Sequence, residues 1–189
     1  MSDLSPGLTQ VLSRLKLLAT DVDGVLTDGA LWIAEDLDLK RFHVRDGLGV
    51  RLAALAGLRV VWISGRTSAA VARRATEIGV AELLEGVGDK LAALTAASRR
   101  ASVTSDEVGF IGDDVNDLPA MRYAAVAFAP ADAAPCVRSA ADYVCRATGG
   151  NGVVREVCEL ILEAQGLLDE AMARYLRVAQ SSPDSVAGM

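Results

Sequence analysis

Two acidic residues follow an apolar run near the start of the chain. Residues 17–29 read LLATDVDGVLTDG, so Asp21 and Asp23 stand one residue apart directly after the apolar stretch. Two carboxylates this close repel each other, and the stretch contains no basic residue that would compensate them. The pair therefore requires a cation from elsewhere, and a cation held by carboxylates can carry out chemistry.

Three further polar groups follow short apolar runs later in the chain. They are Ser64 after RVVWI, Lys90 after AELLEGV, and the acids Asp113, Asp114 and Asp117 of GDDVND after EVGFI. A single Asp or Ser after a strand is most often a helix cap. Four such groups after four runs are better explained by one shared site.

The residue types of this site favour phosphate chemistry. Oxygen ligands without His or Cys select a hard cation, and Mg²⁺ takes one or two carboxylates together with waters and a phosphate. Lys90 and Ser64 would hold the remaining phosphate oxygens. The sequence therefore predicts Mg²⁺ as the cofactor and a phosphate ester or anhydride as the substrate.

The elements that position these groups alternate between strand and helix. Buried strands are expected at 16–20, 59–63, 107–111, 125–129 and 142–145. Amphipathic helical patterns lie between them, at 48–55 before Gly57, at 71–78 before Gly79, and at 89–100. This alternation predicts an α/β fold with a doubly wound parallel sheet. Ligands bind such sheets at the carboxyl ends of the strands, where all four groups lie.

Two segments depart from this alternation. Residues 29–43 show strand-like alternation on both sides of a polar EDLD centre, which predicts a short β-hairpin flap above the strand ends. A last helix is expected from near Asn151, and it either ends at Gly166 or continues through LLDEAMARYL. The final residues, SSPDSVAGM, are small and polar and are expected to be mobile.

The composition narrows the class of protein. A chain of 189 residues with 51% hydrophobic and 4% aromatic residues suits one domain, 1–189, in which helices pack on a parallel sheet. The net charge of -6 argues against a nucleic-acid partner. The sequence has no 18-residue apolar run and no basic-then-apolar leader, and its three cysteines form no CxxC pair. We therefore expect a cytoplasmic protein without a membrane partner.

The motifs resemble those of the haloacid dehalogenase (HAD) superfamily. DVDGVLTD is similar to its first motif, DxDGxxTD; ISGR is similar to the second, Lys90 to the third and GDDVND to the fourth, in the same order and spacing. The resemblance implies that Asp21 is a nucleophile that forms an aspartyl-phosphate. It implies that Asp23 first protonates the leaving alkoxide and then activates water.

The same resemblance implies roles for the remaining polar groups. Asp113 would bind Mg²⁺ together with the Asp21 carboxylate and the Asp23 backbone carbonyl. Ser64 and Lys90 would hold the phosphoryl group during its transfer. The two other acids of GDDVND, Asp114 and Asp117, would support the site through water or hydrogen bonds.

Most of the chain also resembles a narrower family, the 3-deoxy-D-manno-octulosonate 8-phosphate (KDO 8-phosphate) phosphatases. The markers are FHVRDGLGVR at 42–51, ISGR at 63–66, Arg74, and GGNGVVREVCELILEAQGLLDEA at 149–171. The resemblance covers about residues 14–171, and the role of the tail at 172–189 stays open. It implies a phosphatase of lipopolysaccharide biosynthesis in which the β-hairpin replaces a cap domain. It also implies a homotetramer in which neighbouring subunits help to close each site.

The family resemblance implies which residues contact a sugar acid phosphate. Arginine suits this substrate because its paired donors match carboxylate and phosphate. The set is His43, Val44, Arg45, Asp46, Gly47, Arg51, Arg66, Arg74 and Lys90. Position 43 is often Asn in that family, so either the His43 side chain or only its backbone is used.

Three other functions share parts of the pattern. Capless relatives hydrolyse nine-carbon sugar acid 9-phosphates, although the segment GGNGVVREVCELILEAQG favours the octulosonate branch. A phospho-acceptor receiver domain also gathers acids, Mg²⁺ and Lys at strand ends, but there the acidic pair comes first, a lone acceptor Asp follows on a middle strand, and Lys comes last. In this chain DVDGVLTD comes first and GDDVND comes last, after Lys90. A catalytically inactive binding module would usually have lost its nucleophile, and Asp21 is present. The glycines of ATGGNG do not follow the GxGxxG pattern of a dinucleotide site.

Overall fold

The chain folds around one parallel β-sheet. The computed structural model describes residues 4–32 and 38–181, and within them the sheet has six strands in the order β3-β2-β1-β4-β5-β6, all parallel. The strands are β1 (Leu17–Thr20), β2 (Arg59–Ile63), β3 (Glu82–Leu84), β4 (Val108–Ile111), β5 (Val126–Ala129) and β6 (Tyr143–Val144). The predicted α/β fold with a doubly wound parallel sheet is confirmed.

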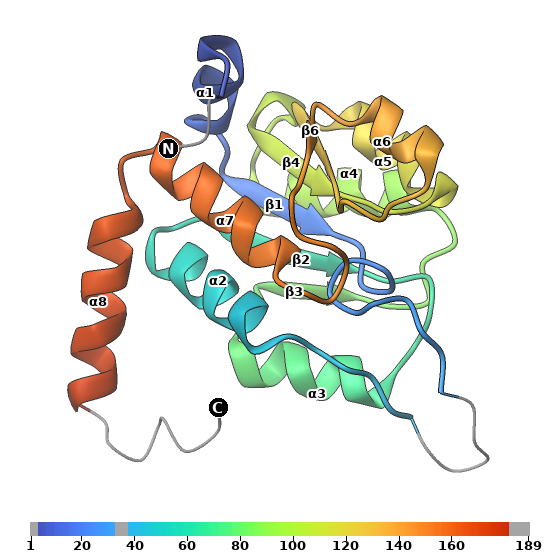
Figure 1. The fold of residues 1–189 in the computed structure, drawn as a ribbon, viewed down its shortest axis with the longest axis horizontal. Helices are drawn as coiled ribbons and strands as arrows, with labels where there is room; N and C mark the ends of the chain where they lie inside the picture. The colour runs from blue at the N-terminus through green and yellow to red at the C-terminus, as the bar shows by residue number, and fades with distance from the viewer. Residues whose placement is uncertain (1–3, 33–37, 182–189) are drawn as a thin grey trace.

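Helices cover both faces of the sheet, which gives three layers (Figure 1). One face packs against α2 (Val44–Leu55), α3 (Ala69–Ile78) and α7 (Val153–Ala164), flanked by α1 (Pro6–Leu12) and α8 (Leu168–Ser181). The other face packs against α4 (Lys90–Ala101), α5 (Leu118–Tyr123) and α6 (Pro135–Ala140). Two 3-10 turns, η1 (Ser105–Glu107) and η2 (Val115–Asp117), lie before and after β4.

The central strands are apolar on both faces because each face has its own core. In β1, Leu18 packs into the core under α2 and α7, whereas Leu17 and Ala19 pack into the core under α4 and α5. All four residues of β1 are buried, as are all four of β4. A strand that is buried on both faces is a continuous apolar run in the sequence. The first polar residue after the run therefore marks the end of the strand.

Helix caps at the carboxyl ends of the strands set where the helices begin. Ser68 caps α3 by accepting a hydrogen bond from the Val71 N–H (3.3 Å). Asp89 caps α4 by accepting one from the Ala92 N–H (3.0 Å), so that Lys90 becomes the first residue of that helix. These caps are the ordinary use of Ser and Asp after a strand, and neither residue belongs to the predicted site.

Two elements differ from the sequence prediction or settle an alternative. The edge strand β3 was not predicted, because its three residues are only half-buried and have no alternating pattern to indicate it.

The last helical region is interrupted after Gln165, where Gly166 has φ +68°, and α8 then begins at Leu168. The segment from residue 172 continues as helix to Ser181, and residues 182–189 lie outside the described part of the chain.

The centre of the expected β-hairpin at 29–43 lies outside the described residues. Residues 33–37 are not described, and the flanking residues 29–32 and 38–43 form no strand. The returning residues 38–42 nevertheless make defined contacts with the start of α3, with β2 and with the loop after β1. In the described part of the chain, no helix is both long and apolar enough to span a bilayer.

Candidate active site

The site lies where the chain connections of the sheet reverse direction. From β1 the chain continues to β2 on one side, whereas β4, its neighbour on the other side, continues to β5. Such a switch point opens a crevice at the carboxyl ends of the strands. The register pairs Thr20 with Ile111, and the Asp21 N–H donates to the Ile111 carbonyl (3.0 Å). The loops after β1 and β4 therefore start at the same level.

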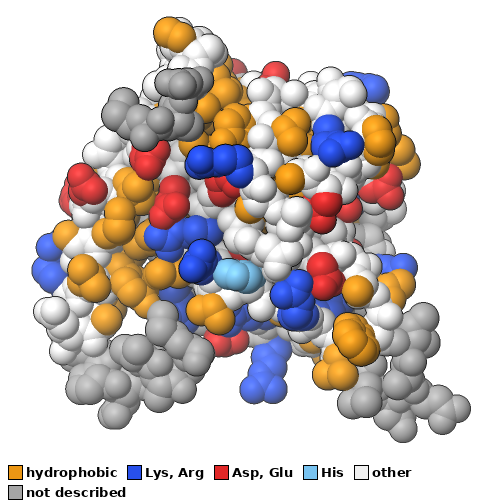
Figure 2. All heavy atoms as spheres, viewed as in Figure 1, with side chains coloured by type: hydrophobic (Ala, Val, Ile, Leu, Met, Phe, Trp, Pro, Cys, Tyr) orange, Lys and Arg blue, Asp and Glu red, His pale blue; other side chains and the backbone are white. Residues whose placement is uncertain are grey.

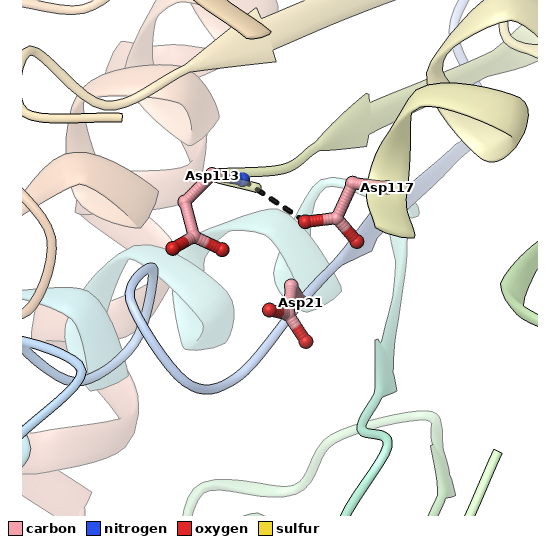
Figure 3. Close-up of side chains that lie close together, drawn as sticks. All are labelled: Asp21, Asp113 and Asp117. Atoms are coloured by element: carbon pink, nitrogen blue, oxygen red, sulfur yellow. Dashed lines mark hydrogen bonds between the residues drawn. The ribbon is translucent and has the colours of Figure 1, made fainter. Parts of the chain in front are cut away.

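Three carboxyl groups meet at this crevice. Asp21, Asp113 and Asp117 each offer one oxygen, and these oxygens all lie within 4.8 Å of one another. Figure 3 shows the Asp21 group at the end of β1, close to the groups of Asp113 and Asp117, which follow β4. Asp21 and Asp117 are buried, with 6% and 0% of their surfaces exposed. This arrangement resembles a metal centre in its ligand types.

Asp117 is the last residue of η2, and its side chain is held by the backbone at the start of that turn. Its Oδ2 accepts hydrogen bonds from the backbone N–H groups of Asp113 (3.0 Å) and Asp114 (3.3 Å). A Cβ on Gly112 would come within 2.5 Å of the Asp117 Cβ, so the turn also requires glycine at that position. The GDDVND motif thus fixes one acid, Asp117, through the backbone of the other two.

Lys90 supplies a buried cation between two of these acids. Its Nζ lies 2.7 Å from Asp21 Oδ1 and 2.6 Å from Asp117 Oδ1, and 3% of its side chain is exposed. Burial lowers the pKa of Lys90, but the charges of Asp21 and Asp117 outweigh burial, so the pKa is raised. Lys90 therefore stays protonated and reaches both carboxylates from the first turn of α4.

One lysine does not neutralise three acids. Burial, and then the charge of Asp117, raise the pKa of Asp21 to about 6, although Lys90 opposes the shift. Burial, and then the charges of Asp21 and Asp117, raise the pKa of Asp113 to about 8. Among the described residues, Asp113 Oδ1 is one of two buried side-chain atoms without a hydrogen-bond partner. The excess negative charge and the unpartnered oxygen fit a divalent cation bound by oxygen.

Asp23 stands outside the carboxylate cluster. Its Oδ1 forms an ion pair with Lys40 Nζ, and 21% of its side chain is exposed. Sequence reasoning did not predict Lys40, which is the first basic residue after the DVDGVLTDG stretch. The only available signal was the missing cation beside the Asp21–Asp23 pair, and that signal does not indicate which lysine supplies it.

The loop that carries Asp23 packs tightly against Asp113 and against the segment that contains Gly150. Gly24 has φ +94°, and a Cβ there would come within 2.0 Å of Asp113 Oδ2. Thr27 Oγ1 accepts hydrogen bonds from the N–H groups of Gly24 (3.4 Å) and Gly29 (3.2 Å), which ties the loop to itself. The Gly150 N–H donates to the Val25 carbonyl (2.8 Å), which joins this loop to residues 149–152, the GGNG segment.

Ser64 directly follows β2 and is buried. Its N–H donates to the Leu84 carbonyl of β3 (2.8 Å), and its Oγ accepts from the Arg66 N–H (3.1 Å). The hydroxyl keeps its own proton available for donation, since it acts as an acceptor in this contact. The Arg66 side chain is exposed beside it.

The other predicted substrate residues lie around the start of α2. His43 caps α2 through its Nδ1, which accepts from the Arg45 N–H (3.2 Å). The buried Asp46 carboxylate accepts from the N–H groups of Gly152 (3.2 Å) and Arg155 (2.8 Å), which ties α2 to the start of α7. The structure thus occupies both side chains with local contacts. Lys and Arg side chains lie close to the single histidine on this face (Figure 2).

Arg51 and Arg74 share one partner on α3. Arg51 Nη2 donates to the Glu77 carbonyl (3.0 Å), and Arg74 Nη1 lies 2.9 Å from Glu77 Oε1. A Cβ on Gly47 would come within 2.6 Å of Arg74 Nη2, so glycine leaves room for this guanidinium. In the described chain, no hydrogen bond or ion pair joins the predicted arginines to the carboxylate cluster.

Comparison with known proteins places this arrangement in a family. The family model described as haloacid dehalogenase-like hydrolase matches residues 63–157. The chain belongs to the haloacid dehalogenase-like hydrolases. The 3-deoxy-D-manno-octulosonate 8-phosphate phosphatase of Salmonella typhimurium is 40% identical over 174 residues, covering 92% of this chain and 93% of that protein. The phosphatase of the same name from Escherichia coli is 42% identical over 164 residues, covering 86% and 87%.

Solved structures of hydrolases with the same name share the fold. The KDO 8-phosphate phosphatase of Moraxella catarrhalis is 39% identical, has a TM-score of 0.86, and is matched over 91% of this chain and 99% of that chain. That structure is a complex with a magnesium ion, a phosphate ion and a KDO molecule. The Yersinia pestis phosphatase is 38% identical with a TM-score of 0.85, covering 88% of this chain and 90% of that chain.

Proposed function

We propose that this hydrolase removes the phosphate from KDO 8-phosphate, giving KDO and inorganic phosphate, with Mg²⁺ as its cofactor. The main support for this proposal is the cluster of three acids, Asp21, Asp113 and Asp117, at the ends of β1 and β4, with Lys90 of α4 between two of them. Relatives about 40% identical over nearly the whole chain are phosphatases of that name. A lipopolysaccharide precursor pathway and a cytoplasmic location belong to the same proposal.

Asp21 and Asp113 would hold the magnesium ion through their carboxylates, together with the Asp23 backbone carbonyl. The unpartnered Asp113 Oδ1 and the raised pKa values of both acids support this assignment, because a cation would relieve the crowded negative charge. When bound, magnesium supplies charge neutralisation to the phosphoryl oxygens and lowers the repulsion between substrate and acids.

In the first half of the reaction, Asp21 is the nucleophile. Its carboxylate oxygen forms a bond to phosphorus while the bond from phosphorus to the sugar oxygen breaks, which leaves an aspartyl-phosphate. Asp23 donates its proton to the departing sugar oxygen, so that the product leaves as an alcohol. Lys90 and the Ser64 hydroxyl stabilise the charge on the oxygens of the transferring phosphoryl group.

In the second half, Asp23 acts as the base. Its carboxylate accepts a proton from a water molecule, and the water oxygen forms a bond to phosphorus. The bond between phosphorus and the Asp21 oxygen breaks, which releases inorganic phosphate and restores the Asp21 carboxylate. Asp23 is protonated again and ready for the next substrate. Asp114 and Asp117 support the site, Asp117 by holding Lys90 and the turn after β4.

Substrate recognition is assigned to the arginines and to the first turn of α2. Arg45 and Arg66 are exposed near strand and helix ends, where their guanidinium groups can reach a sugar carboxylate or phosphate. Arg51 and Arg74 are pre-oriented by Glu77. The remaining positions of this turn in the proposal are His43, Val44, Asp46 and Gly47.

A homotetramer with shared active sites is part of the proposal. Leu31, Trp32 and Leu39 flank residues 33–37 and have 48%, 68% and 54% of their surfaces exposed. Exposed aromatic and aliphatic side chains gathered on one segment are typical of subunit contacts. Sedimentation or light scattering of the full chain tests this point, and a monomer at assay concentrations would contradict it.

Phosphate release from a panel of sugar phosphates tests the function. With Mg²⁺, we expect turnover of KDO 8-phosphate at a kcat/KM well above that for nine-carbon sugar acid 9-phosphates and for simple hexose phosphates. EDTA should abolish release, and added Mg²⁺ should restore it. Preference for a nine-carbon substrate would replace the proposed substrate, and a stable phospho-aspartate without turnover would indicate a receiver domain.

A further inference from the structure

Lys40 is a nearly buried lysine in residues 38–43, which precede α2. It contacts the catalytic loop, which is the loop at residues 21–29 that follows β1 and carries Asp21 and Asp23. Its Nζ contacts Asp23 Oδ1 across 17 residues of sequence, and only 7% of its side chain is exposed. Among the described residues, Asp23 is the one carboxylate with which Lys40 forms an ion pair. Lys90, by comparison, is buried between two carboxylates.

The residues around Lys40 hold its backbone in place from both sides. Asp38 Oδ2 accepts hydrogen bonds from Ser68 Oγ (2.7 Å) and from the Ala70 N–H (3.0 Å) at the start of α3. Two residues after Lys40, the ring of Phe42 stacks on the buried Trp62 ring at 6.2 Å between centroids and 11° between planes. The position of Lys40 therefore does not depend on its contact with Asp23 alone.

The neighbouring Arg41 provides a contrast on the same segment. It also forms an ion pair, with Asp28 Oδ2 at 3.0 Å, but 53% of its side chain is exposed. Exposed pairs of this kind contribute little to stability. Lys40 instead places a desolvated ammonium group against a carboxyl group that is itself mostly buried, which is costly unless the contact serves a purpose.

We propose that Lys40 is a positioning residue that orients the Asp23 carboxyl group for proton transfer to the leaving oxygen. The inference rests on the proposed function. Lys40 binds Oδ1, which leaves Oδ2 to carry the proton in the first half of the reaction and to accept one in the second. A protonated carboxyl group still accepts a hydrogen bond at its carbonyl oxygen, so the contact is compatible with both states.

This role predicts a dependence on the leaving group. A sugar alkoxide is a poor leaving group and requires the proton from Asp23, whereas p-nitrophenolate leaves readily without one. The value of kcat/KM reports the steps up to formation of the aspartyl-phosphate, where the leaving group departs. Loss of the Asp23 orientation should therefore lower kcat/KM for KDO 8-phosphate far more than for p-nitrophenyl phosphate.

The test compares Lys40→Met with Arg41→Met in the full chain with Mg²⁺. For Lys40→Met we expect kcat/KM for KDO 8-phosphate to fall by about 10- to 100-fold and that for p-nitrophenyl phosphate by less than about 3-fold. Arg41→Met, which removes an exposed ion pair from the same segment, should change both values by less than about 3-fold. The aryl phosphate also reports whether each variant is folded.

A double-mutant cycle separates positioning from direct substrate binding. If Lys40 acts through Asp23, adding Lys40→Met to Asp23→Asn should lower kcat/KM for KDO 8-phosphate no further. Lys40→Arg, which keeps a cationic donor, should stay within about 10-fold of the wild type. An equal loss for both substrates, or the full Lys40→Met loss in the Asp23→Asn background, would overturn the inference and leave the proposed function intact. A wild-type chain that released phosphate from neither substrate would overturn both.

Discussion

Gly149 lies so close to Gly24 that a Cβ on Gly149 would come within 2.0 Å of the Gly24 carbonyl oxygen. The next residue, Gly150, donates its N–H to the Val25 carbonyl (2.8 Å), and a Cβ there would come within 2.5 Å of the Asp28 nitrogen. The GGNG segment is therefore a support that packs directly on the backbone of the catalytic loop. Its glycines are required for this close approach and not for binding a dinucleotide.

Substituting Gly149 should disturb the proposed metal site through that support. A methyl group at Gly149 must displace the Gly24 carbonyl, and Gly24 in turn abuts Asp113 Oδ2. For Gly149→Ala we expect weaker Mg²⁺ activation, by about 10-fold or more in half-saturating concentration, and a loss of about 1–3 kcal/mol in stability. Mg²⁺ titration of activity and thermal unfolding measure the two effects.

The matched control for Gly149→Ala is Gly7→Ala. Gly7 lies in α1, and a Cβ there would meet nothing within 4 Å. Alanine is also the better helix former, so this variant should be at least as stable as the wild type, with unchanged Mg²⁺ activation. Equal Mg²⁺ activation in Gly149→Ala and Gly7→Ala would show that the GGNG segment does not support the catalytic loop.

Removal of the proposed nucleophile should separate activity from stability. Asp21→Asn keeps the size of the side chain but removes the attacking carboxylate, so we expect kcat to fall by roughly 10⁴-fold or more. Because burial and Asp117 raise the pKa of Asp21 to about 6, its charge is unfavourable in the metal-free fold at pH 8. The variant should therefore melt no lower than the wild type in EDTA. A variant that retained activity would contradict the assigned mechanism.

The carboxylate cluster should make metal-free stability depend on pH. The pKa of Asp21 is raised to about 6 and that of Asp113 to about 8, both from 3.8. Between about pH 4 and pH 8 these two groups therefore bind more protons in the folded state than in the unfolded state, and their contribution to stability falls as pH rises. In EDTA, the melting temperature should decrease from pH 5 to pH 8.5. Differential scanning calorimetry across this range measures the slope.

Magnesium should reverse this loss, with Asp113→Asn as the control. At pH 8 and about 100 times its Kd, Mg²⁺ should raise the melting temperature by about 5–10 °C, because it binds only the folded state. The same addition at pH 5 should have a smaller effect, since protons then compete for the carboxylates. Asp113→Asn should flatten the pH dependence and lose the response to Mg²⁺. A wild-type melting temperature that rose with pH in EDTA would show that the raised carboxyl pKa values do not govern the pH dependence.

The sequence was enough to predict the site residues that directly follow the central strands. Asp21 and Asp113 each follow a strand buried on both faces, and neighbouring parallel strands bring their carboxyl ends together by register. Lys40 and Gly149 were not predicted as partners of the catalytic loop. Lys40 belongs to a segment without regular periodicity, and the Gly149 contact depends on two loops meeting in three dimensions. Neither local pattern nor residue type encodes such meetings.

Arg74 offers a test of the proposed substrate subsite. Its guanidinium lies over Gly47 and is held by Glu77 Oε1 (2.9 Å), so it is pre-oriented for a planar anion. Arg74→Met should raise KM for KDO 8-phosphate by about 10- to 100-fold, because a charge-assisted hydrogen bond contributes about 1.5–3 kcal/mol. Turnover of p-nitrophenyl phosphate, which lacks the sugar carboxylate, should change little. The adjacent, exposed Arg73 provides the control, and Arg73→Met should leave both substrates unaffected. If the two variants raised KM equally, net charge on α3 and not the Arg74 contact would be responsible.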